Sequence, residues 1–254
     1  MSAALFVDYI YLDTDERRRF AQVSHEYLIT QLQFTGDESV SNNTYKVKLN
    51  FNHPCKELIW VVQKDVFTAD PSSSDNATVQ AARPCGKQWF NFTDAYDKTY
   101  LSTFGYNASA GDVVTPDSVG GLSYNAGLPG VAAGGANGVY LPVSFEGGKN
   151  PILLAKLQLN GHDRVAERDG KYFNIVQPYQ HHENVPQCGI NVYSFALKPE
   201  EHQPSGTCNM SRIDNASLSL KLTNETGAAK VRVYAINYNV LRIMSGMGGL
   251  AYSN

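Results

Sequence analysis

Apolar and polar residues alternate over much of the chain, which predicts β-strands. Between 45 and 51 every second residue is apolar, and from 217 to 222 leucines alternate with serines and a lysine. Side chains of a strand point to its two faces in turn, so this period fits strands with one buried face. Similar runs predict further strands at 4–12, 58–62, 152–159, 172–176, 190–197 and 230–240. About eight short strands with polar connections indicate an all-β sandwich or barrel.

The first of these runs differs from the others and is followed by a predicted helix. Ala4–Leu12 is apolar on both faces apart from Asp8, which predicts a central strand. Asp13 then fits an N-cap position, and Glu16 follows at the spacing of a capping box. Helical spacing further along predicts a buried stripe made of Phe20, Val23 and Tyr27. We therefore expect one short helix near the N-terminus.

The composition changes between Phe67 and Asn150. This stretch is rich in Gly, Ser, Ala, Asn and Tyr, and it carries little charge. Such a composition is poor at forming a core, yet the aromatic residues between 89 and 106 argue against disorder over the whole stretch. We expect one long loop region at 67–150, partly folded on its aromatic residues, within a single domain that spans 1–254.

Composition and charge exclude several classes of protein. The 254 residues are 43% hydrophobic and 18% charged, with a formal net charge of −3. This balance provides no basic surface, so no direct nucleic-acid binding is expected. Neither a basic leader at residues 1–12 nor an apolar run of the ~20 residues that cross a bilayer is seen, so we expect no signal peptide and no transmembrane segment. The four cysteines include no CxxC pair, which predicts free thiols.

The motifs of the sequence do not point to catalysis. A nucleophile elbow, a phosphate-binding loop and a dinucleotide fingerprint are all missing, so we expect no enzyme and no cofactor. His181-His182-Glu183 is the most metal-like cluster, but neighbours on a strand face opposite ways, so the histidines are expected to serve hydrogen bonds rather than a metal. A cupin-like metal enzyme stays a minor alternative. The glycine-rich stretch Ser245–Gly249 predicts a flexible terminal arm.

Three separated blocks resemble one protein family. From 188 onward the chain reads CGINVYSFALKPEEHQPSGTCNMSRIDNASLSL and then VRVYAINYNVLRIMSGMGGLAYSN. The other two blocks are NGHDRVAERDGKYFNIVQPYQHH at 160–182 and the segment 7–33. Together they resemble the major capsid proteins of large nucleocytoplasmic double-stranded DNA viruses, the group of iridoviruses, phycodnaviruses, mimivirus and African swine fever virus.

The resemblance implies a structural protein of the virion. Family members contain two consecutive eight-stranded antiparallel jelly rolls, and three copies form a pseudo-hexagonal capsomer of an icosahedral shell. The chain is similar to the second jelly roll, with 67–150 as an outer tower loop. The implied partners are further copies in a homotrimer, neighbouring capsomers and minor capsid proteins, with assembly in the host cytoplasm. A truncated gene, an incomplete sequence and a free-standing half all fit the missing first jelly roll.

Residues can be named for two roles. Assembly contacts are expected from the helix arginines and the apolar terminal arm, namely Arg17, Arg18, Arg19, Leu241, Ile243, Met244, Leu250 and Tyr252. For the arm, ordinary packing of a last strand is an equal alternative. Glycosylation is expected first at the sequons of the inserted region, Asn76, Asn91 and Asn107. An alternative function is carbohydrate or receptor binding through the aromatic residues of 89–106, because jelly rolls also form lectins.

Overall fold

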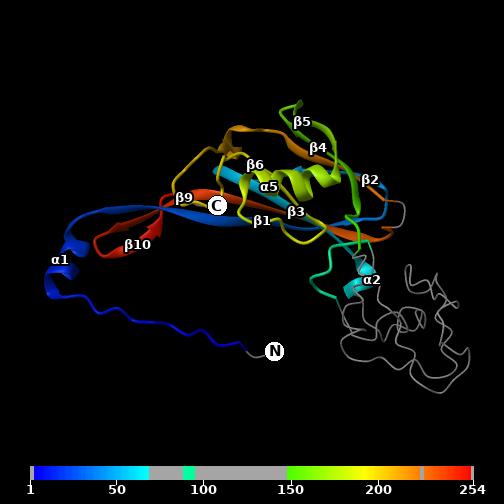
Figure 1. Ribbon diagram of the computed structural model, residues 1–254. Helices are drawn as coiled ribbons and strands as arrows, with labels where there is room; N and C mark the ends of the chain where they lie inside the picture. Colours follow the sequence, from blue (N-terminus) through cyan, green and yellow to red (C-terminus); the bar gives the residue numbers. More distant parts are fainter. Residues whose placement is uncertain (1–2, 69–87, 95–147, 224–225, 253–254) are drawn as a thin grey trace, which may run out of the picture.

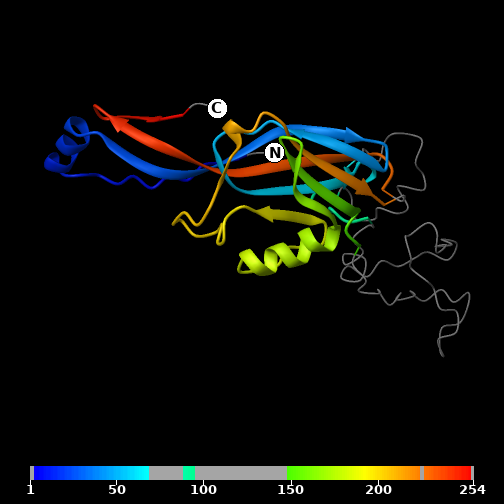
Figure 2. The ribbon, with the colours of Figure 1, turned by 90° about the horizontal axis from the view of Figure 1, so that it is seen from above.

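Two antiparallel sheets face one another in the structure, a computed structural model that describes residues 3–68, 88–94, 148–223 and 226–252 (Figure 1, Figure 2). The larger sheet has the order β1 (His25–Val40), β9 (Ala229–Met244), β3 (Pro54–Lys64) and β6 (Ile190–Ser194). The smaller sheet has the order β2 (Thr44–Leu49), β8 (Ala216–Leu222), β4 (Ile152–Leu159) and β5 (His162–Asp169). Two short strands extend the larger sheet, β10 (Met247–Leu250) on β9 and β7 (Cys208–Asn209) on β3.

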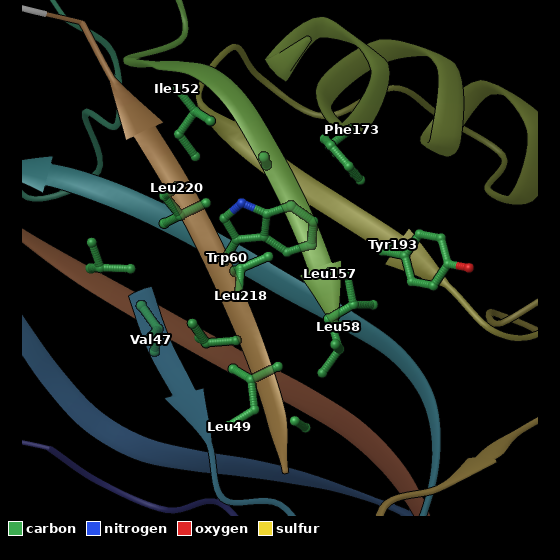
Figure 3. Close-up of a cluster of buried hydrophobic side chains, with 14 of the residues drawn as sticks. Val47, Leu49, Leu58, Trp60, Ile152, Leu157, Phe173, Tyr193, Leu218 and Leu220 are labelled. Carbon is green, nitrogen blue, oxygen red and sulfur yellow. The ribbon is translucent and has the colours of Figure 1, made fainter. Parts of the chain in front are cut away.

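The core lies between the sheets because each strand turns one apolar face inward. From the larger sheet the deeply buried side chains are Leu58, Trp60, Val62, Val231 and Ala235. They meet residues of the smaller sheet, chiefly Val47, Leu157, Leu218, Leu220 and Leu222 (Figure 3). Burying a side chain of this size contributes about 1.5–3 kcal/mol, so the alternating pattern read from the sequence is also the main source of stability.

The all-β class and the antiparallel sandwich are confirmed, but the strands are not all short. The described residues form ten strands, four on the path of each sheet and two short additions, where the sequence predicted eight. Strands β1 and β9 have 16 residues each and pair along their whole length. Strand β5 was not predicted because only Val165 in it is buried, which leaves no alternating apolar pattern.

A helical segment replaces the strand predicted at 172–176. A π-helical turn, η1 (Tyr172–Val176), continues into α5 (Gln177–His181). Its buried side chains follow a helical period, with Phe173 and Asn174 on one turn and Gln177 on the next. Ile175 is apolar but exposed, so the apolar run at 172–176 did not indicate a buried strand. Phe173 closes the open side of the sandwich, its ring 5.1 Å from that of Trp60.

The N-terminal predictions were only partly right. Helix α1 (Thr14–Gln22) begins where expected, and the Asp13 carboxylate accepts a hydrogen bond of 2.7 Å from the amide of Thr14, not from Glu16. None of its residues is buried, so the predicted stripe of Phe20, Val23 and Tyr27 is wrong, and Tyr27 belongs to β1. The segment 4–12 is extended and exposed and pairs with no described strand. The prediction of a central strand at 4–12 is therefore wrong. The segment is apolar, but no described element covers it.

Most of the predicted insertion lies outside the described residues. Its start coincides with the short helix α2 (Asp65–Thr68), and a described piece at 88–94 packs on β3 and β6. The side-chain amide of Gln63 donates 2.7 Å to the carbonyl of Trp89, and Gly189 approaches the carbonyl of Phe92 too closely for any Cβ. A turn of 3-10 helix, η2 (Met210–Arg212), completes the described elements.

Candidate assembly interface

One end of the larger sheet projects beyond the sandwich. Strand β9 pairs with β3 only as far as Asn237, and from there it has only β1 and β10 as neighbours among the described strands. We call residues 25–30, 238–244 and 247–250 the projecting ribbon. Figure 1 and Figure 2 show it extending from the sandwich with α1 at its tip. The described strands of the smaller sheet do not pair with it. Tyr238 and Asn239 at its base are buried, and its other side chains are half-buried or exposed.

The terminal arm predicted to be flexible is instead a β-hairpin. Ser245 and Gly246 both have positive φ, 52° and 78°, the backbone that a tight two-residue hairpin turn requires. Strand β10 then pairs back on β9, and the side-chain amide of Asn239 donates 2.8 Å to the carbonyl of Tyr252. The glycines that suggested flexibility serve the turn and the edge strand.

The predicted arm residues lie together on this ribbon. Leu241 is the register partner of both Tyr27 and Leu250, and Ile243 is opposite His25. Both are half-buried, while Met244, Leu250 and Tyr252 are exposed. The alternative for these residues was ordinary core packing of a last strand. It is wrong, because these side chains lie outside the core.

The three arginines are brought to the same end of the molecule. Helix α1 contacts the end of β9, and the ring of Phe20 lies 4.8 Å from that of His25 at the start of β1. Arg17, Arg18 and Arg19 are exposed as predicted, and Arg18 pairs with Asp15 at 3.5 Å. The two groups of assembly candidates, more than 200 residues apart in sequence, thus share the projecting end.

An exposed apolar surface on the larger sheet was missed by the sequence reading. The outer side of β1 carries Leu28, Leu32 and Phe34, with exposed fractions of 37%, 62% and 45%. Their register partners on β9 are Val240, Ile236 and Tyr234, and the rings of Phe34 and Tyr234 stack at 4.8 Å. We call these six residues the outer apolar face. The signal was present in LITQLQF, where Leu28, Leu32 and Phe34 share one face, but Thr30 interrupts that face and Ile29 lies on the other.

Strand β1 also forms the edge of its sheet, since among the described strands it pairs only with β9. An edge strand presents unpaired backbone groups that another chain can use. Charged pairs stand at its two ends. Arg232 binds Asp37 through two bonds of 2.8 and 3.2 Å, and this guanidinium holds the pKa of Asp37 below its ordinary value. Arg242 pairs with Glu26 at 2.7 Å on the projecting ribbon.

The two histidines of the metal-like cluster serve hydrogen bonds, as predicted, although on a helix rather than a strand. His181 ends α5 and its Nδ1 lies 2.9 Å from the carbonyl of Leu197. His182 reaches Glu57 on β3 at 2.7 Å, with both side chains nearly buried. The hydrogen bond to Glu57 raises the pKa of His182. Groups of three or more potential metal ligands do not occur in the described part of the chain.

The remaining predicted site residues are the sequons. Asn91 was expected to be exposed, but it is buried, and its side-chain oxygen accepts from the amide and hydroxyl of Thr93 at 2.9 and 2.7 Å. The prediction of Asn91 as an exposed glycan acceptor is therefore wrong. Asn76 and Asn107 lie outside the described residues. Among the helices that the structure describes, none is long and apolar enough to cross a membrane.

Comparison with known proteins decides the family. The model described as large eukaryotic DNA virus major capsid protein matches residues 16–249. The chain belongs to this family. The match includes the outer apolar face, the projecting ribbon except Leu250, and α1 from Glu16 onward.

Individual capsid proteins match the whole chain. The major capsid protein of Phaeocystis pouchetii virus is 56% identical over 278 residues, covering 100% of this chain and 53% of that protein. The major capsid protein of Paramecium bursaria Chlorella virus 1 is 41% identical and covers 99% and 54%. A solved structure, the PBCV-1 virus capsid, aligns with a TM-score of 0.62 at 36% identity over 97% of this chain and 56% of that chain. The chain thus spans about half the length of these relatives.

Proposed function

We propose that the chain is a structural subunit of a viral capsid, without enzymatic activity, and that it associates into trimeric capsomers through its exposed apolar surfaces. The outer apolar face carries this proposal. Leu32 and Phe34 are large apolar residues that are exposed to solvent, and they lie on the same face of an edge strand. Contiguous exposed apolar side chains of this kind mark contact surfaces.

The arrangement suits association by packing rather than chemistry. Strands β1 and β9 pair with each other from the sandwich into the ribbon, so the outer apolar face and the projecting ribbon belong to one continuous sheet. A closed trimer repeats one pair of complementary surfaces on each subunit, which makes a long edge strand and a projecting hairpin useful elements. The exposed arginines of α1 stand at the tip beside Asp15 and Glu16, so this end offers charged groups of both signs to a neighbouring surface.

Further parts of the proposal follow from the family. Neighbouring capsomers and minor capsid proteins are the expected later partners, the virion is the expected location, and assembly is expected in the host cytoplasm. We propose that 67–150 forms the outer loop region of a single domain spanning 1–254. The described piece at 88–94, in contact with Gln63 and Gly189, supports a position of this region beside β3 and the start of β6.

The native mass of the purified chain, measured by light scattering on a sizing column, tests the association. We expect a trimer whose population falls in the variant Leu32→Asp. The matched control is Leu153→Asp on β4 of the other sheet, where Leu153 has a similar exposed fraction of 45%, and its trimer should persist. A monomer at every concentration, or equal association of both variants, would contradict the proposal.

A second function has one observation in its favour. Trp89 and Phe90, in the described piece 88–94, are exposed by 52% and 84%. Exposed aromatic rings can stack on sugar rings, as the alternative of carbohydrate or receptor binding requires. Binding to a glycan array that is lost in Phe90→Ala would support this alternative, and an array without signal would argue against it.

A further inference from the structure

Two of the cysteines face each other across the larger sheet. Strand β7 consists of only two residues, and it pairs antiparallel with the start of β3 so that Cys208 is the register partner of Cys55. Cys55 is completely buried in the core, and Cys208 is half-buried and packs against that same core. Both thiols therefore lie on the inner face of the sheet, and both are free.

This placement meets the Cα-distance requirement of a disulfide. Directly opposite residues of an antiparallel pair have Cα atoms about 4.5–5.5 Å apart, and disulfides join Cα atoms about 4.4–6.8 Å apart. The two thiols are also close enough to influence each other electrostatically. Cys188 is exposed and precedes β6, where it has neither cysteine as a register partner. The pairing of Cys55 with Cys208 is thus set by β7 rather than by chance proximity.

We propose that Cys55 and Cys208 form an oxidation site that closes to a cross-strand disulfide when a small-molecule disulfide such as oxidised glutathione is present. The thiolate of Cys208, the more accessible of the two, attacks one sulfur of the oxidant, and one glutathione leaves as a thiolate. The Cys55 sulfur then attacks the Cys208 sulfur, and the second glutathione leaves with the proton of Cys55. The two cysteine sulfurs are oxidised and the oxidant is reduced to two thiols.

The disulfide would fasten a long connection to the sheet. Between β6 and β7 the chain is attached to β3 by few bonds, notably those from the amides of Phe195 and Ala196 to the carbonyl of Lys56. Beyond β7, the amide of Met210 donates to the carbonyl of His53 at 3.1 Å. A covalent link at Cys208 would add to this attachment. Burial raises the pKa of both thiols, so closure should be slow near neutral pH and faster as the pH rises.

The experiment uses the full chain carrying Cys85→Ser and Cys188→Ser, so that only the proposed pair remains. The protein is incubated with oxidised glutathione and analysed by intact mass and by peptide mapping without reduction. We expect the loss of two hydrogen atoms, a linked peptide containing positions 55 and 208, and a melting temperature higher by roughly 5–15 °C that a reductant reverses. Adding Cys208→Ser should abolish all three.

A second variant keeps the test independent of folding. With Cys55→Ala in the same background, Cys208 should retain one bound glutathione, since no second thiol can displace it. The proposal is overturned if the unaltered pair also retains glutathione without losing two hydrogen atoms. It is equally overturned if the main product is a disulfide between two chains, seen as a doubled mass without reductant.

Discussion

The sandwich and the projecting ribbon share the same two long strands but have opposite environments. Where β9 passes between β1 and β3, its inward residues from Ala229 to Ala235 are buried under the smaller sheet. Where it continues to Met244, the strand meets no second sheet in the described part of the chain. Asn237, Tyr238 and Asn239 are still buried, and from Val240 onward its residues are half-buried or exposed. On the inward side of the strand, Asn237 and Asn239 interrupt the apolar series, which resumes at Leu241 and Ile243. The apolar residues of the two regions differ in whether a second sheet covers them.

This difference indicates a division of labour. The sandwich supplies the free energy of folding, since nearly all deeply buried side chains belong to it. The ribbon, α1 and the outer apolar face contribute little to folding and remain available for contact. Substitutions in the two regions should therefore separate stability from association.

The largest expected effect belongs to the core. Leu218→Ala removes a completely buried side chain between the sheets and leaves a cavity, which should lower the free energy of unfolding by about 2–5 kcal/mol. Leu32→Ala on the outer apolar face should lower it by less than ~1 kcal/mol. Urea unfolding monitored by tryptophan fluorescence measures both. Equal losses would show that the outer face is part of the folding core.

The next effect concerns the buried pair that fastens α5 to β3. Glu57 raises the pKa of His182, so the stability contributed by the charged pair is fully present below the ordinary histidine pKa of about 6.5 and is lost as pH rises through the raised value. Glu200 adds to the same shift, and Lys56 lies next to Glu57 in the sequence.

Glu57→Gln should therefore cost about 1.5–3 kcal/mol at low pH and less at high pH. Unfolding curves of both proteins across pH measure the difference. As a control, Glu201→Gln changes an exposed pair with Lys198 and should shift the curves little. A constant difference between Glu57→Gln and the unaltered protein at every pH would contradict the role of His182.

A smaller and local effect is expected at the hairpin of the ribbon. Gly246 has φ of +78°, a conformation that costs an L-residue with a side chain roughly 1–2 kcal/mol. Gly246→Ala should thus increase hydrogen exchange of the amides of β10 without changing the exchange of β3. Gly249→Ala, at a glycine with open space around its Cβ position and no positive φ, is the matched control. Faster exchange throughout the sandwich would show that the ribbon is not a separate unit.

The smallest effect belongs to the exposed pair between Glu26 and Arg242. Arg242→Ala should lower the free energy of unfolding by about 0.2–1 kcal/mol, because solvent screens both groups. The difference should shrink further in high salt. Thermal unfolding at low and high ionic strength measures it. A loss that salt does not reduce would indicate that packing of the arginine stem, rather than its charge, matters.

The sequence by itself determined the fold class, most strands and the family. Alternation at 44–51, 152–159 and 217–222 fixed strands that the structure confirms, because in a sandwich one face of each strand must be apolar. The N-cap at Asp13 was equally readable, since it depends on the nearest backbone amide. The resemblance in three blocks predicted the family that the comparison shows.

Tertiary structure alone decided which apolar residues are covered. The segment 4–12, the stripe expected on α1 and the outward side of η1 are apolar without being buried, whereas Asn91, Glu57 and His182 are polar and largely enclosed. The pairing of Cys55 with Cys208 and the joining of α1 to the C-terminal hairpin also arise only from the sheet order. The physical reason is that burial depends on which distant segment packs against a residue, and local periodicity carries no information about that partner.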